Sequence, residues 1–133
     1  MSQSEHCFNL DELCNKILSI DNNIQTVTII GKNGKPVEEA IRCSWKNTEE
    51  KHEMFFMSHA LEISLGKDFD DQFGKVNYTF TSRDNLSVLS FPMEDHFLLV
   101  VYQSQIGPIS LAMKIKSLIM YHQKHVDESV IKN

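Results

Sequence analysis

The chain has few of the residues that build crosslinked or fibrous proteins. It contains 3 cysteines, 3 prolines and 5 glycines among 133 residues. The cysteines, Cys7, Cys14 and Cys43, are odd in number and lack the paired spacing of a disulfide framework or a zinc knuckle. We therefore expect reduced thiols, and we exclude a small disulfide-stapled fold.

Long apolar runs and basic clusters are absent as well. The apolar run at 97–102 is far too short to span a bilayer. The first six residues are polar, which does not match a secretory signal. The formal net charge is -5, with no basic run to offset it. Nucleic acid and an anionic membrane surface are therefore not expected as partners, and the expected location is cytoplasmic.

The composition that remains is typical of one globular domain. Hydrophobic residues make up 41% and charged residues 23% of the chain, which is ordinary for a folded protein of this length. We expect a single domain over residues 1–133, with an ordered core from about residue 8 to 122. Residues 123–133 are polar and are expected to form a frayed tail.

The first third predicts a helix followed by a hairpin. Asn9 with Glu12 three residues later forms a capping-box pattern at the start of a helix that Asp21 ends. Residues 24–30 are rich in β-branched side chains and predict a strand. The Asn-Gly pair in 31–35 predicts a tight turn into a second strand at 35–40. Pro36 lacks an N–H and favours an edge position for that strand.

The stretch 53–73, above all its first half, 53–65, carries the main functional clue. It has helical spacing, with Thr48 as the candidate cap, but its apolar residues occupy more than one face. One face consists of Met54, Met57, Leu61 and Leu65, widened by Phe55; the other consists of Phe56, Ala60 and Ile63. A helix that is apolar nearly all round is buried nearly all round. One face can cover a sheet, so the other predicts a contact with a second protein surface.

Three more strands and a helix complete the chain. Residues 76–83 alternate apolar and polar side chains, as a strand near a sheet edge does. Residues 86–91 predict the next strand, and 97–102 are apolar on both faces, as expected for a central strand. Pro108 suits the first position of a last helix. The predicted fold is an α/β (α+β) sandwich: a five-stranded antiparallel sheet with helices on both faces, in the order α-β-β-α-β-β-β-α.

The order of elements over roughly 9–121 resembles the roadblock family of dynein light chains and GTPase-associated proteins. The hairpin at 24–40, the central strand at 97–102 and the final helix after Gly107 carry the resemblance. It implies a fold similar to profilin and longin domains, and dimerisation through the middle helix and the adjacent edge strand. Here these are 53–65 and 76–83. The implied dimer contact consists of Met54, Met57, Leu61, Leu65, Tyr78 and Phe80.

No catalytic, cofactor or metal motif stands out. The glycines of 31–34 fit a hairpin turn better than a phosphate loop, because no helix start follows. The acidic residues of 68–71 lack the glycine and glutamate of a calcium loop. His122 and His125 are three residues apart on one helical face and could share a metal. His52 and His59 are seven apart on the central helix and could face their copies at a two-fold axis, as a pH-sensitive or metal-bridged contact. Partly buried or solvated histidines are the alternative, and no nucleophile elbow is present.

Two functions of different classes follow. The first is a non-catalytic homodimeric scaffold or regulator of another protein, for which the resemblance implies a small Ras-like GTPase. The second is a PAS-like or GAF-like small-ligand sensor, whose pocket inside one subunit would be lined by Trp45, Phe55, Phe56 and Met57. A hydrolase is a third and weaker interpretation.

Overall fold

The sheet forms the middle layer of the fold. The computed structural model describes residues 9–43, 46–103, 105 and 107–132, with side chains described up to Lys124. The strands lie in the order β2-β1-β5-β4-β3, with every neighbouring pair antiparallel. Their bounds are β1 (Ile24–Gly31), β2 (Pro36–Ile41), β3 (Thr79–Thr81), β4 (Leu86–Pro92) and β5 (His96–Gln103).

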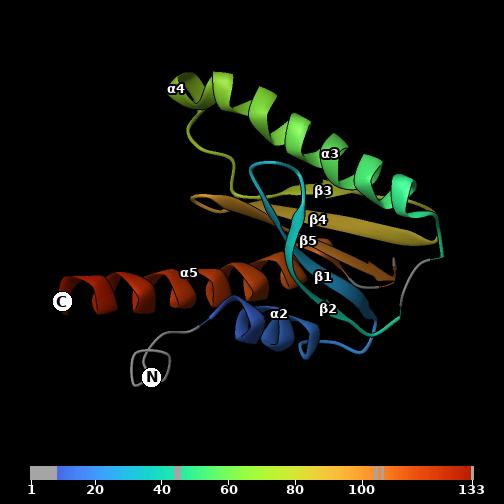
Figure 1. The fold of residues 1–133 in the computed structure, drawn as a ribbon, viewed down its shortest axis with the longest axis horizontal. Helices are drawn as coiled ribbons and strands as arrows, with labels where there is room; N and C mark the ends of the chain where they lie inside the picture. Colours follow the sequence, from blue (N-terminus) through green and yellow to red (C-terminus); the bar gives the residue numbers. More distant parts are fainter. Residues whose placement is uncertain (1–8, 44–45, 104, 106, 133) are drawn as a thin grey trace.

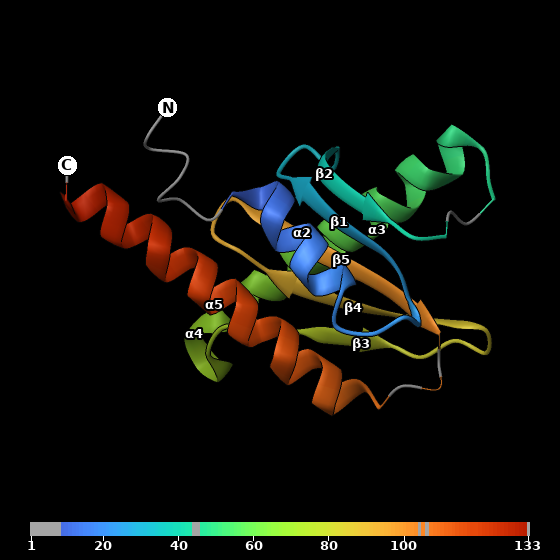
Figure 2. The same ribbon diagram turned by 90° about the horizontal axis from the view of Figure 1, so that it is seen from below.

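Helices cover both faces of this sheet, as the sequence predicts. α2 (Leu10–Leu18) and α5 (Pro108–Lys132) lie side by side under one face, and α3 (Glu49–Gly66) lies over the other (Figures 1 and 2). Two short turns, η1 (Lys67–Phe69) and α4 (Asp70–Phe73), continue from the end of α3. The prediction of an α+β sandwich with this order of elements is therefore confirmed.

The central strand β5 separates two apolar cores. Its even-numbered side chains Leu98, Val100 and Tyr102 join the core beneath α2 and α5, and its odd-numbered neighbours join the core beneath α3. All of these side chains are buried. The expectation that 97–102 is a covered central strand is confirmed, and it fixes which helix packs on which face.

The start of the chain follows the local rules. Asn9 caps α2, since its Oδ1 accepts from the Glu12 backbone N–H at 2.7 Å. The β1–β2 turn closes with the Gly34 N–H donating to the Gly31 carbonyl at 2.9 Å. β2 lies at one edge of the sheet. The turn reading of 31–34 and the edge position of Pro36 are both confirmed.

The strand predicted at 76–83 is shorter than expected. β3 spans only Thr79–Thr81 and pairs with β4, with Thr79 opposite Ser90. One cause is the partner strand: continuing the register would place Asn77 opposite Pro92, which has no N–H to donate. Asn77 instead accepts from Lys116 Nζ of α5 at 2.6 Å.

The start of α3 agrees with the sequence, whereas α5 is longer than expected. α3 begins at Glu49, because Thr48 Oγ1 accepts from the Lys51 N–H at 3.2 Å and caps the helix where the sequence suggested. α5 continues through the region expected to fray and ends at Lys132.

Candidate functional site

The candidate site is the outer surface of α3. The inner surface of this helix packs on the sheet through Phe56, Ala60 and Ile63, which join Val88, Phe97, Leu99 and Val101 in one core. Burying a side chain such as Phe56 contributes roughly 1.5–3 kcal/mol, so this face anchors α3. Phe55 also packs against this core rather than widening the outer face, and its ring lies edge-on to Phe56.

The other apolar face of α3 is uncovered within one subunit. Met54, Met57, Leu61 and Leu65 are all more than half exposed, between 51% and 63%. We call these four residues the α3 stripe. Phe69 and Phe73, in the two short turns that follow α3, are exposed as well.

One edge of the α3 stripe faces the β1–β2 hairpin. Gly34, in the turn between β1 and β2, approaches Met57, which places that side of α3 next to the hairpin. Successive residues of a helix are rotated by about 100° about its axis. Ser58 and Glu62 therefore flank the α3 stripe on the side away from the hairpin. Glu62 lines a cleft together with Thr79 of β3. The side of α3 nearest β3 is therefore polar.

The structure does not bring Tyr78 and Phe80 to the α3 stripe. Phe80 pairs with Leu89, whose side chain belongs to the core beneath α2 and α5, so Phe80 points to that face and is 40% exposed. Tyr78 is half-buried against the same core, with its ring 5.9 Å from that of Phe91. The six residues implied by the resemblance thus occupy opposite faces of the sheet.

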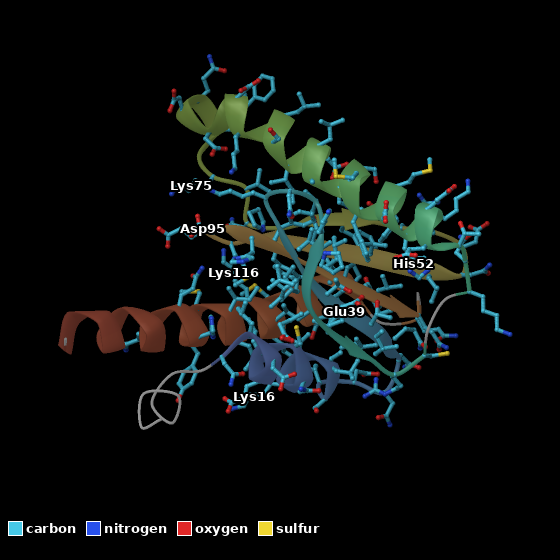
Figure 3. The ribbon with its side chains drawn as sticks, viewed as in Figure 1. Lys16, Glu39, His52, Lys75, Asp95 and Lys116 are labelled. Atoms are coloured by element: carbon cyan, nitrogen blue, oxygen red, sulfur yellow. The ribbon has the colours of Figure 1, made fainter. Side chains whose placement is uncertain are left out.

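The histidines of α3 turn towards the sheet rather than outwards. Figure 3 shows His52 beneath α3, and its ring lies 6.5 Å from Phe56. His59 lies 4.8 Å from Phe55, and its Nδ1 is buried. Burial lowers the pKa of His59, Glu62 raises it and Arg83 lowers it further. These positions do not suit a metal bridge at an axis on the outer face of α3.

The pocket expected for a ligand sensor is not formed by the residues predicted for it. Phe55 and Phe56 pack on the sheet, Met57 is exposed, and Trp45 lies outside the described residues. The structure has a cleft of about 930 Å³ elsewhere, at the β4–β5 turn. Its lining is mixed in charge and includes Lys67, Asp70, Lys75, Asp95 and His96.

The described residues offer no assembled metal centre. No group of three or more His, Cys, Asp or Glu side chains converges within the described part of the chain. His122 is buried on α5, whereas the side chain of His125 lies outside the described residues.

Among the helices described, none is both long and apolar enough to cross a bilayer.

Comparison with known proteins shows which solved structures share this fold. A scan against models of protein families and a search of curated proteins by sequence find no match. Among solved structures, the roadblock/LC7 domain from Streptomyces avermitilis matches with a TM-score of 0.69 and 12% identity, covering 89% of this chain and 98% of that chain. MglB from Myxococcus xanthus matches with a TM-score of 0.70 and 15% identity, over 89% of this chain and 94% of that one.

The chain has the roadblock/LC7 fold. Profilin II from Acanthamoeba castellanii is also similar, with a TM-score of 0.59 and 13% identity, covering 85% of this chain and 95% of that chain. The resemblance read from the order of elements is therefore confirmed at the level of the fold. At this identity the roadblock/LC7 likeness describes architecture, and function has to be argued from the α3 surface.

Proposed function

We propose that this roadblock/LC7 fold serves as a non-catalytic, homodimeric scaffold that binds another protein. The observation that carries the proposal is the α3 stripe: Met54, Met57, Leu61 and Leu65 are exposed on a helix whose other face is anchored in the core. Contiguous exposed apolar side chains on a folded domain mark an interaction surface. A second copy supplies the same apolar surface, so two stripes cover each other across a two-fold axis.

Two surfaces of the subunit contribute to this proposed dimer: the α3 stripe and the edge of β3. The proposed helix contact is centred on the α3 stripe, and Phe80 lies on the other face of the sheet, outside this helix contact. β3 is an edge strand of the described sheet, next to β4, and its outer backbone edge offers groups that a neighbouring β3 can meet. The partner class that the roadblock resemblance implies is a small Ras-like GTPase.

Sedimentation equilibrium at micromolar concentration tests the dimer. The wild-type chain is expected to sediment as a dimer and Leu61→Glu as a folded monomer, because a carboxylate in the stripe is desolvated on association but exposed in the free subunit. Met113→Glu is the matched control: Met113 is a similarly exposed apolar residue on α5, across the sheet, and its variant should remain dimeric. A monomeric wild-type chain would remove the dimer from the proposal.

Affinity capture from a lysate of the source organism, followed by mass spectrometry, tests the partner. Wild-type protein is expected to retain a Ras-like GTPase, and Leu61→Glu to lose it if the partner recognises the dimer. Capture of no GTPase in either nucleotide state would argue against this partner class. The capture experiment does not test the dimer, which sedimentation equilibrium tests separately.

A further inference from the structure

A second exposed apolar strip lies on the opposite face of the molecule. The inner side of α5 is buried through Leu111, Ala112, Ile115 and Ile119. On its outer side Ile109, Met113 and Met120 are 58% to 69% exposed. At about 100° per residue these three fall within an arc of about 40°, and at 1.5 Å per residue they extend over about 16 Å. We call them the α5 stripe.

The charged residues of α5 along the α5 stripe are lysines. Between Pro108 and Lys124 the sequence has three lysines, Lys114, Lys116 and Lys124, and no aspartate or glutamate. Lys116 donates to Asn77 Oδ1 at 2.6 Å. Figure 3 shows Lys116 on the sheet side of α5. Within the described residues no salt bridge reaches Lys114 or Lys124; the one found joins Lys32 to Asp95 at 3.3 Å. Asp127 and Glu128 follow Lys124 in the sequence, so this excess of positive charge is confined to residues 108–124 of a chain whose net charge is -5.

We propose that the outer surface of α5 is a docking site for an acidic amphipathic helix of a partner protein. The apolar side of such a helix covers Ile109, Met113 and Met120, while its carboxylates meet Lys114 and Lys124. Helix recognition of this kind uses apolar anchors spaced over successive turns, and flanking charges set the choice of partner and its orientation. The inference rests on the proposed protein-binding function and names the receiving surface and the chemistry of the partner.

A protein helix fits this surface better than a membrane does. Recognition of anionic lipid depends on clusters of roughly four to eight basic residues, whereas this surface offers three lysines, one of them engaged by Asn77. The net charge of -5 would also repel an anionic bilayer. A single acidic helix needs only a few complementary charges and avoids that general repulsion.

The two stripes can act at the same time. α3 and α5 lie on opposite faces of the sheet (Figure 1), so a dimer formed through the α3 stripe leaves both α5 stripes accessible. Since the core holds the inner side of α5 in place, docking requires no rearrangement of the helix, which limits the entropic penalty of binding.

Fluorescence anisotropy with the full chain tests the proposal. The probe is a labelled synthetic helical peptide with a leucine stripe flanked by glutamates; the control peptide carries lysines at the glutamate positions. The glutamate peptide is expected to bind at least about tenfold more tightly. Its affinity should fall several-fold as salt rises from about 50 to about 300 mM, because exposed charge pairs are screened.

Variants of the chain locate the site. Met113→Glu is expected to weaken binding of the glutamate peptide at least about tenfold, and Lys114→Glu with Lys124→Glu about five- to tenfold, since each replaces attraction by repulsion. Leu61→Glu, on the other face, should bind the peptide as the wild type does. Circular dichroism checks that each variant keeps its helices.

Several outcomes would overturn the proposal. These are equal binding of the two peptides, unaltered binding by Met113→Glu, or recruitment to phosphatidylserine vesicles without peptide binding, which would assign the surface to lipid. Failure of the dimer has a separate signature. In that case wild type and Leu61→Glu sediment alike, while discrimination between the peptides at α5 is unchanged.

Discussion

Gly34 in the β1–β2 turn lies directly against Met57 of α3. A Cβ built on Gly34 would sit 2.0 Å from the Met57 Sδ, far inside van der Waals contact. Gly34 also has a φ of 80°, where only glycine is free of strain. The contact ties the hairpin at one edge of the sheet to the helix that carries the α3 stripe. Glycine is therefore required at this position by both the turn and the helix.

Replacing Gly34 by alanine should destabilise the protein by more than backbone strain alone. The positive φ accounts for about 1–2 kcal/mol, and displacement of Met57 adds to it. Met57→Ala provides the control background, because it removes the side chain that an added Cβ at Gly34 would meet. Urea unfolding at fixed protein concentration measures the loss of stability caused by Gly34→Ala in the wild type and in Met57→Ala. The loss should be smaller in the Met57→Ala background, whereas equal losses in the two backgrounds would show that the Met57 contact contributes nothing.

Arg42 joins the end of α2 to the start of β1 through three backbone carbonyls. Its Nη1 donates to Asp21 O at 2.9 Å and Ile24 O at 2.5 Å, and its Nη2 donates to Leu18 O at 2.8 Å. A lysine has one charged nitrogen and cannot reproduce this fork. We expect Arg42→Lys to lower the free energy of unfolding by about 1–3 kcal/mol, measured by urea denaturation.

Lys32 provides the comparison for Arg42. Its salt bridge with Asp95 spans 3.3 Å between side chains that are mostly exposed, and such pairs contribute about 0–1 kcal/mol. Lys32→Ala should therefore leave the urea midpoint nearly unchanged. An Arg42→Lys variant as stable as Lys32→Ala would show that the three bonds add no net stability.

The elements of the fold were predictable wherever a local rule decides the structure. The Asn9 cap, the turn at Gly34 and the doubly apolar strand β5 each depend on a few adjacent residues, so the sequence alone indicated them. The short β3 was not predictable in this way. Its length depends on Pro92 of the neighbouring strand, and the register that brings Asn77 opposite Pro92 becomes known only from the folded sheet.

The candidate site was predictable in part for the same reason. Helical spacing identified the α3 stripe, and these four residues are exposed as one face. The face on which Phe80 lies depends on its pairing with Leu89, a contact that spacing within the strand cannot reveal. The approach of Gly34 to Met57 and the three bonds of Arg42 join distant segments and leave no pattern in the sequence.

Cys14 should be unreactive in the folded protein. Burial, together with the negative charges of Glu38, Asp11 and Glu39, raises the pKa of its thiol to about 12. The thiolate, which is the reactive form, is therefore scarce at about pH 8. Cys43 is exposed and should react with iodoacetamide quickly, whereas Cys14 should react only after unfolding.

Mass spectrometry of the alkylated protein measures the modification of Cys14. The experiment uses a Cys7→Ser variant, because Cys7 lies outside the described residues. Denaturing guanidinium chloride provides the reference in which both remaining thiols react. Modification of Cys14 as fast as Cys43 under native conditions would contradict its buried position.

His59 should make the stability of the protein depend on pH. It is half-buried between α3 and the sheet, its ring lies 4.8 Å from that of Phe55, and its Nδ1 has no hydrogen-bond partner among the described residues. Burial lowers the pKa of His59, Glu62 opposes this shift and Arg83 adds to it. The folded state therefore takes up the proton less readily than the unfolded state, whose histidine titrates near pH 6.5.

The sign of the effect follows from this difference in proton binding. Above about pH 6.5 His59 is neutral in both states and the full stability is present. As the pH falls below that value the unfolded state binds the proton first, so stability declines until the pH passes the lowered pKa of folded His59. In His59→Gln this part of the decline should disappear, which urea midpoints between about pH 5 and 8 would measure. His96→Gln, at the start of β5, controls for the loss of one imidazole. If His59→Gln follows the wild-type profile, the proton taken up on acid unfolding must come from a different group.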